Sequence, residues 1–194
     1  MSMITTVSGD QTEILKSIMV LHNEGKPFDA DLTYGNGGFW KSIPPPAYLS
    51  DIEPKGPGIF REDATKLTLP DKYFGSVVFD PPFIHAPGKA SIMGRQFGGF
   101  KSQQELGVMY SDSLWEIYRV LTPKGLLVFK CQDIVESGKQ VWNHIRVYEW
   151  ARLWGFRAED LFILTGKGSI VGHNHSRQVH ARKTHSYFWV FRKK

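Results

Sequence analysis

Apolar and polar residues alternate along the first half of the chain in short periodic runs. Apolar residues between positions 14 and 21 recur at helical spacing after Asp10, a candidate helix cap, and predict an opening helix. Four strand-like runs follow, in the order FDADLT (28–33), AYLSDI (47–52), GIFRE (58–62) and SVVFD (76–80). The first of these runs has the weakest strand propensity.

The second half of the chain has longer elements. The stretch QQELGVMYSDSLWEIYRVL (103–121) has helical spacing, ends near TPKG and leads into LLVFKC (126–131), a buried-strand pattern. The stretch QVWNHIRVYEWARLWGF (140–156) predicts a further helix that is stopped by Gly155.

Two apolar runs, LFILT (161–165) and HSYFWVF (185–191), predict the last two strands. Because no clear helix joins them, we expect an antiparallel pair at one edge of a sheet. Alternating strands and helices with near-continuous apolar strands predict an α/β fold, with a mostly parallel sheet covered by helices on both faces.

Composition and charge narrow the class of protein. The 194 residues, 41% hydrophobic and 22% charged, fit a single globular domain over 1–194. The formal net charge is +5, and positions 166–194 hold seven Lys or Arg and no acidic residue, which favours a polyanionic partner. The single Cys131 excludes an internal disulfide framework. Without a secretory signal or a membrane-length apolar stretch, we expect a soluble cytoplasmic protein that has no membrane partner.

Candidate chemistry lies where the predicted strands end, since open parallel sheets bind ligands at their carboxyl ends. These ends carry the Gly-rich turn DLTYGNGGF (31–39), the acids Asp51 and Glu53, the segment 63–65, and Asp80-Pro81-Pro82-Phe83. The turn does not follow GxGxxG, and the chain has no GxxxxGK[ST] sequence. Nicotinamide dinucleotides and nucleoside triphosphates are therefore disfavoured as ligands.

The order of these motifs resembles the S-adenosylmethionine-dependent amino methyltransferases that act on nucleic-acid bases. The turn 31–39 resembles the family's DxxxGxGxF cofactor loop, and DPPF (80–83) matches its [DNS]PP[YFW] catalytic motif. The resemblance covers the chain roughly from Asp29 to the end. It implies a Rossmann-like methyltransferase fold with a mostly parallel seven-stranded sheet and an antiparallel edge strand.

The resemblance implies S-adenosylmethionine as the cofactor. Asp51 stands where an acid holds the ribose, and Asp63 where one contacts the cofactor adenine. The implied cofactor-binding residues are Asp31, Thr33, Tyr34, Gly35, Gly37, Asp51, Ile52, Asp63 and Ala64.

The DPPF motif has a chemical rationale. The exocyclic amine of a base is a poor nucleophile because its lone pair is delocalised into the ring. The Asp80 carboxylate and the Pro81 carbonyl can accept its two N–H groups and stabilise the positive charge that develops during attack. Pro82 stiffens the backbone, and Phe83 is expected to stack on the target base.

Two basic segments are candidates for nucleic-acid recognition, because the chain is short for a separate recognition domain. The insertion loop 84–104 follows the catalytic motif, and the loop 166–184 precedes the last strand. The candidate substrate-binding residues are His85, Lys89, Arg95 and Lys101 in the first loop and Arg177, Arg182 and Lys183 in the second.

Several functional hypotheses follow. Asp in the first motif position is usual for adenine N6 in this family, so DNA adenine is the favoured acceptor. The alternatives are an RNA base, a protein side-chain amide, which the basic end of the chain disfavours, and a non-catalytic nucleic-acid-binding subunit. Intact Asp80, Gly35 and Gly37 argue against the last of these.

Two other features are interpreted structurally. His173 and His175 lie in a basic loop without a set of metal ligands, so no metal site is expected. Trp142, Trp150 and Trp154 in the predicted late helix are assigned to packing.

Overall fold

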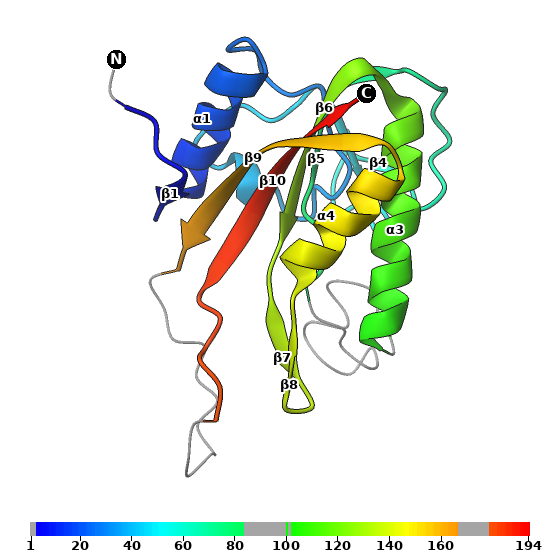
Figure 1. Cartoon of the computed structure of the whole chain (residues 1–194). Helices are drawn as coiled ribbons and strands as arrows, with labels where there is room; N and C mark the ends of the chain where they lie inside the picture. The colour runs from blue at the N-terminus through cyan, green and yellow to red at the C-terminus, as the bar shows by residue number, and fades with distance from the viewer. Residues whose placement is uncertain (1–2, 84–99, 101, 167–178) are drawn as a thin grey trace.

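The computed structural model describes residues 3–83, 100, 102–166 and 179–194. Within this part of the chain, an eight-stranded sheet lies between helices on both faces (Figure 1). Its strands are β1 (Val7–Ser8), β2 (Ala30–Asp31), β3 (Tyr48–Asp51), β4 (Phe60–Arg61), β5 (Phe74–Phe79), β6 (Leu121–Cys131), β9 (Phe156–Thr165) and β10 (His185–Lys193). The remaining elements are the helices α1 (Gln11–His22), η1 (Gly38–Trp40), α3 (Gln103–Val120) and α4 (Asn143–Leu153), and a hairpin of β7 (Ile134–Glu136) and β8 (Lys139–Val141).

The sheet order is β1-β9-β10-β6-β5-β2-β3-β4. Strand β10 is antiparallel to both β6 and β9, whereas the other neighbouring pairs are parallel. The predicted α/β class, mostly parallel sheet and antiparallel last pair are confirmed. The seven predicted strands gain an eighth, β1, which pairs with β9 and covers that edge. Its two residues are too few to show a periodic pattern.

Each face of the sheet carries its own core. On β5, Val77 and Phe79 pack toward α3 and α4, while Val78 packs toward α1 and η1. All three side chains are at most 1% exposed. Burial on both faces explains why this strand is a continuous apolar run rather than an alternating one.

Helices α1 and α3 begin at capping side chains. The Asp10 carboxylate accepts the Thr12 N–H (2.8 Å), so the predicted start of α1 is confirmed. Helix α3 begins at Gln103, capped by Ser102. The last two positions of the predicted 84–104 loop are therefore helical.

The predicted helix over 140–156 is wrong at its start. Residues 140 and 141 belong to β8, and α4 begins only at Asn143. The β7–β8 turn has positive φ at Ser137 (47°) and Gly138 (74°), as a two-residue type I′ hairpin requires. A Ser-Gly pair between short β-prone runs is a signal that could have identified this hairpin.

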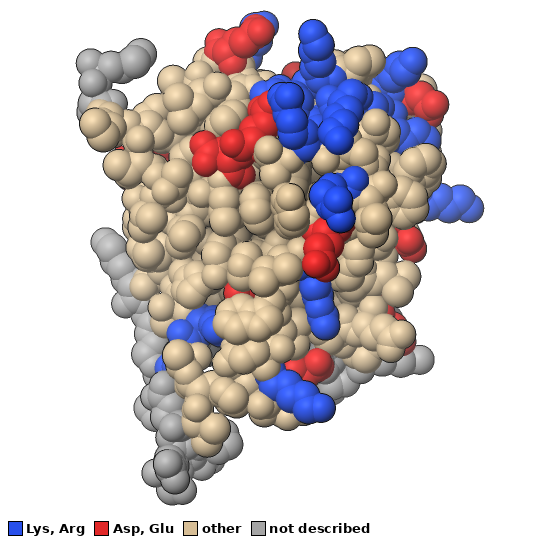
Figure 2. Space-filling view, viewed as in Figure 1, with Lys and Arg blue, Asp and Glu red and all other residues tan. Residues whose placement is uncertain are grey.

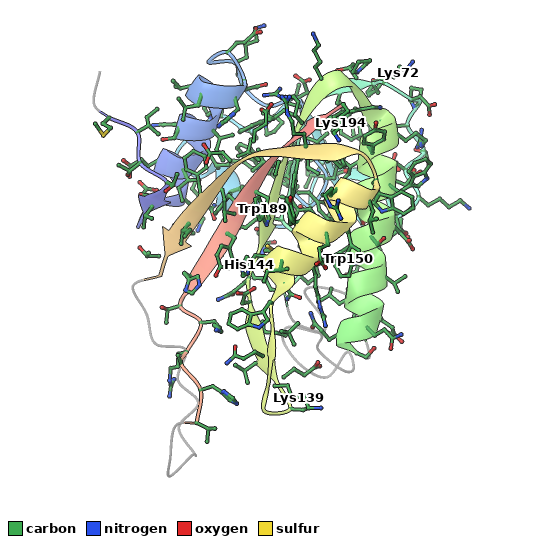
Figure 3. The ribbon with its side chains drawn as sticks, viewed as in Figure 1. Lys72, Lys139, His144, Trp150, Trp189 and Lys194 are labelled. Atoms are coloured by element: carbon green, nitrogen blue, oxygen red, sulfur yellow. The ribbon has the colours of Figure 1, made fainter. Side chains whose placement is uncertain are left out.

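Positive charge is unevenly placed on the face shown in Figure 2. The densest group of Lys and Arg side chains lies at the upper end, where Figure 3 labels Lys72 and Lys194. That end is opposite the β7–β8 hairpin, near whose tip Lys139 is labelled. None of the described helices is both long and apolar enough to cross a membrane.

We expect Phe129→Ala to lower the free energy of unfolding by about 3–5 kcal/mol, because it leaves a cavity in the core under α3. Phe129 is fully buried, and its ring lies 5.2 Å from that of Phe79 and 5.3 Å from that of Tyr110. Urea denaturation measures the change. The control Val108→Ala, at a position 55% exposed on α3, should change stability by less than ~0.5 kcal/mol. Equal effects of the two changes would contradict the assignment of this core.

Candidate functional site

The Gly-rich turn after β2 is organised around a buried carboxylate. Asp31 accepts the Thr33 N–H at Oδ1 (2.8 Å) and the Trp40 Nε1–H at Oδ2 (2.7 Å). Burial raises the pKa of Asp31 to about 7, although the hydrogen bonds from Trp40 and Thr33 act in the opposite direction. Through these hydrogen bonds, the buried Asp31 carboxylate fixes the backbone of the turn at Thr33 and the position of the Trp40 side chain.

Two glycines in this turn have the left-handed backbone. Gly35 has φ 57° and Gly37 has φ 69°, a region that side-chain-bearing residues rarely adopt. A Cβ on Gly37 would also lie only 2.7 Å from Tyr34 Oη. Glycine is required at position 37 because of both the backbone conformation and the packed tyrosine ring.

A pocket of about 710 Å³ opens above the carboxyl ends of β2, β3 and β5. Seven of the nine predicted cofactor-binding residues line it: Thr33, Tyr34, Gly35, Asp51, Ile52, Asp63 and Ala64. Asp31 and Gly37 do not line it and support the turn instead. We call this cavity the first pocket.

The first pocket carries acceptors along its wall. The Asp51 carboxylate accepts the N–H groups of Gly35 (2.8 Å) and Glu53 (2.9 Å), and Asp63 accepts the Thr65 N–H (2.9 Å). Each carboxylate oxygen has two lone pairs. Both side chains are therefore held in place and can still accept hydroxyl or amino groups from a ligand.

The DPPF motif is fixed from two sides. The Asp80 N–H donates to Thr33 Oγ1 (2.7 Å), and the Tyr110 hydroxyl donates to the Pro82 carbonyl (2.6 Å). Tyr110 is 1% exposed and was not identified from the sequence. Its only signal there is that it lies on the buried face of the α3 pattern.

The two oxygens of the Asp80 carboxylate have different surroundings. Its Oδ1 is buried and has no hydrogen-bond partner among the described residues, while Oδ2 lies 3.4 Å from Lys130 Nζ. Burial raises the pKa of Asp80, and the nearby Lys130 ammonium counteracts this shift. A buried acceptor oxygen without a partner is unfavourable for stability, which makes Asp80 a candidate for contact with a ligand.

Lys130 on β6 is a second residue that sequence reasoning missed. Its side chain is only 12% exposed, and Nζ also donates to Gln11 Oε1 (2.9 Å). The ammonium lies 4.7, 5.5 and 5.4 Å from the ring centroids of Phe39, Phe83 and Phe188, respectively. A lysine inside the apolar run LLVFKC was the available signal, because lysines are rarely buried without a partner.

A second pocket, of about 600 Å³, lies on the other side of the motif. Asp80, Pro81 and Pro82 line both pockets. The second pocket is further lined by Phe83 and by the segments 132–135 and 180–184. The catalytic motif predicted from the sequence is therefore the wall between two cavities.

The predicted substrate-binding residues are only partly described. Arg182 and Lys183 line the second pocket together with the DPPF motif. The others lie outside the described residues: His85, Lys89, Arg95, Lys101 and Arg177. His173 and His175 lie outside them too, and no cluster with metal-ligand character occurs in the described part of the chain.

The three predicted packing tryptophans differ. Trp150 and Trp154 pack against the core around α3 and α4. For Trp142 the packing assignment is wrong, because this side chain is 46% exposed. Its indole lies under the Lys183 ammonium, with Nζ 4.5 Å from the ring centroid.

Neither a protein-family model nor a curated protein matches this sequence. Solved structures nevertheless share its fold. A proposed sarcosine dimethylglycine methyltransferase from Galdieria sulphuraria aligns over 94% of this chain and 84% of its own (TM-score 0.58, 13% identity). A proposed methyltransferase from Bacillus halodurans aligns over 96% and 99%, respectively (TM-score 0.53, 13% identity). The chain thus has the Rossmann-like fold of these methyltransferases.

A proposed DNA modification methylase from Thermus thermophilus, in complex with S-adenosyl-L-methionine, matches 68% of this chain at 21% identity (TM-score 0.47). This chain spans about half the length of that protein, covering 53% of it.

We expect Gly37→Ala to lower the free energy of unfolding by about 1–2 kcal/mol, the cost of a left-handed residue that carries a Cβ. Gly38→Ala is the matched control, since a Cβ there would meet no atom within 4 Å. Chemical denaturation of both variants measures the difference. Equal stability of the two would show that the conformation of the turn at position 37 is not constrained.

Proposed function

We propose that this protein transfers a methyl group from S-adenosylmethionine to the exocyclic amino group of a base in DNA, with adenine N6 as the acceptor. The observation that carries the proposal is that Asp80, Pro81 and Pro82 line both pockets. A donor bound in the first pocket and a base bound in the second would meet at this motif.

The first pocket suits the proposed cofactor. Asp51 and Asp63 offer acceptors to the hydroxyl and amino groups of an adenosine. Gly35 lines this pocket with φ 57° and has no side chain that would keep a ligand away from the backbone of the turn. Bound S-adenosylmethionine would supply an electrophilic methyl group on a sulfonium centre.

The motif residues then act on the acceptor amine. The unpartnered Asp80 Oδ1 accepts one amino N–H, and the Pro81 carbonyl accepts the other. These acceptors oppose delocalisation of the nitrogen lone pair and stabilise the charge that develops on nitrogen. The nitrogen–methyl bond would form as the methyl–sulfonium bond breaks and a neutral thioether leaves. The surplus proton on nitrogen would then pass to solvent by way of the Asp80 carboxylate. Phe83, in the wall of the second pocket, provides the stacking surface for the base.

Lys130 supports this arrangement as a positioning residue. An ionised Asp80 is costly in a buried position, and the ammonium 3.4 Å away offsets part of that cost. The contact engages Oδ2 and leaves Oδ1 for the substrate. The lysine thus keeps the acceptor charged and oriented.

The choice of DNA adenine rests on the first residue of the motif and on the basic wall of the second pocket. Asp at position 80 is the residue that the resemblance associates with adenine N6. Arg182 and Lys183 provide cations for phosphates beside the target. An RNA base is the competing acceptor, and the experiment below separates the two.

We expect Asp80→Ala to reduce methyl transfer at least ~100-fold, because it removes an acceptor that acts in the transition state. Radiolabelled S-adenosylmethionine is incubated with DNA, RNA and protein acceptors, and the methylated nucleoside is identified. Label in RNA alone would exclude the DNA assignment. Equal transfer by Asp80→Ala and unchanged protein would exclude the mechanism.

Cofactor binding provides the control for this experiment. Calorimetry should show S-adenosylmethionine binding by both the unchanged protein and Asp80→Ala, since the first pocket keeps its Asp51 and Asp63 acceptors. Absence of binding to the unchanged protein would overturn the enzymatic proposal as a whole.

We expect Lys130→Met to move the acidic limb of the pH–rate profile to higher pH. Activity requires ionised Asp80 and is lost as pH falls through its pKa. Burial raises that pKa and Lys130 lowers it, so loss of the ammonium raises it further. Asp31, Tyr110 and Cys131 also interact electrostatically with Asp80, and all three residues are still present in the Lys130→Met variant.

The profile is measured at saturating cofactor and substrate. Lys139→Met, at an exposed position of β8, is the matched control and should leave the limb in place. A lower rate with an unshifted acidic limb would show that Lys130 acts only on packing.

A further inference from the structure

We propose that Trp142 and Lys183 form a stacking platform for the nucleotide next to the target base, on the outer side of the second pocket. The proposal rests on the proposed function, because it takes a nucleic acid as the substrate. It assigns a role to the one predicted core tryptophan that the structure leaves exposed.

Local structure does not account for Trp142. It occupies the N-cap position of α4 and makes no side-chain capping hydrogen bond. Ser, Thr, Asp and Asn are the residues that normally fill this position. The cap is supplied from outside the helix, since Asp133 accepts the His144 N–H (3.2 Å). A small polar residue at position 142 would serve the helix at least as well.

Core packing does not account for it either. The flanking side chains Val141 and Asn143 are 7% and 1% exposed, respectively, whereas Trp142 is 46% exposed. Trp is among the most buried residue types on average. Exposure alone does not distinguish Trp142, because Trp115 is equally exposed. What distinguishes it is its contact with Lys183, a residue of the second pocket's wall.

The platform has a rigid support. His144 Nδ1 lies 2.8 Å from both oxygens of Asp133, and because a carboxylate can only accept, this nitrogen carries the proton. The His144 ring also stacks on Tyr187 (4.4 Å) and stands edge-on to Trp142 (6.3 Å). The Trp189 indole donates to the His144 carbonyl (2.9 Å). Figure 3 labels His144 and Trp189 at the start of α4.

The platform adjoins the second pocket. Lys183 belongs to the pocket wall, and its carbonyl accepts a hydrogen bond from the Gln132 side chain (3.0 Å), another wall residue. Its ammonium extends 4.5 Å over the Trp142 ring. Trp142 therefore contacts a residue of the pocket wall without lining the pocket itself.

This pairing matches the chemistry of an unpaired nucleotide. An indole offers a flat face to any base, and stacking of a base on an aromatic side chain contributes roughly 1–3 kcal/mol. A base that stacks on the ring face under Lys183 would displace the ammonium, which could then meet the phosphate of the same nucleotide. Phe83 would hold the target base and Trp142 its neighbour, so two consecutive nucleotides would be held unstacked from each other.

The test uses the full chain without cofactor, so that no methyl transfer takes place. Binding of a fluorescein-labelled single-stranded DNA of about 12 nucleotides, a typical site size for such strands, is followed by fluorescence anisotropy. We expect Trp142→Ala to raise Kd about tenfold, within the range for loss of one stacked base, and Trp142→Phe to raise it less than about threefold. The matched control is Trp115→Ala, on α3, whose side chain is likewise 46% exposed and whose Kd should not change.

An abasic oligonucleotide of the same length separates stacking from charge. The unchanged protein and Trp142→Ala should bind it equally, while Lys183→Ala should reduce the salt dependence of binding by about one phosphate contact. The platform is excluded if Trp142→Ala binds the base-containing DNA as tightly as the unchanged protein. It is also excluded if the unchanged protein binds no oligonucleotide, or if Trp115→Ala weakens binding equally.

The outcome is distinguishable from failure of the proposed function. Trp142-dependent binding without methyl transfer to any nucleic acid would sink the proposed reaction and leave the platform standing. Methyl transfer to a nucleic acid with Kd and KM unaffected by Trp142→Ala would exclude the platform and support the proposed reaction. Thermal melting verifies the fold, and if Trp142→Ala does not fold, Trp142→Leu compared with Trp142→Phe gives the same contrast.

Discussion

One hydrogen bond joins the two halves of the site: the Asp80 N–H donates to Thr33 Oγ1 at 2.7 Å. It forms because β2 and β5 are parallel neighbours, with Asp31 opposite Val78, so their carboxyl ends emerge side by side. Thr33 in turn donates to Asp31, which shapes the Gly-rich turn. The Gly-rich turn and the DPPF motif are therefore joined by hydrogen bonds at the ends of two paired strands. The pairing of β2 with β5 fixes the position of the motif that separates the two pockets.

The electrostatics of this wall follow from burial. Asp80 and Lys130 are both largely withdrawn from water, at 24% and 12% side-chain exposure, and lie 3.4 Å apart. Such a pair costs desolvation energy that its attraction offsets only in part. Asp80 Oδ1 has no partner within the described residues, so the arrangement is better suited to receiving a ligand than to stabilising the fold. The three phenyl rings around the lysine stabilise its charge without competing as hydrogen-bond acceptors.

The sequence patterns were most informative where the chemistry is local. The Gly-rich turn, Asp51, Asp63 and the DPPF motif each lie at or just after the end of a strand, and the parallel sheet brings these strand ends to one edge. Lys130 was missed because a single lysine in an apolar run forms no motif with neighbouring residues that would indicate a role. The start of α4 was misplaced because Val141, the one apolar residue of β8, fits the helical period of the residues that follow it. Trp142 was misassigned because its sequence context is that of a core helix, whereas the structure places it at the N-cap of α4 and leaves it 46% exposed.

By itself, the sequence determined the α/β class, the mostly parallel sheet and the identity of the strand-end motifs, because periodicity and glycine placement are properties of neighbouring residues. Only the tertiary structure decided which groups touch. It set Lys130 of β6 against Asp80 of the motif after β5, Tyr110 of α3 against Pro82, and Lys183 over Trp142. These contacts join residues 28 to 50 positions apart. Their formation depends on strand order and helix packing, which no local pattern encodes.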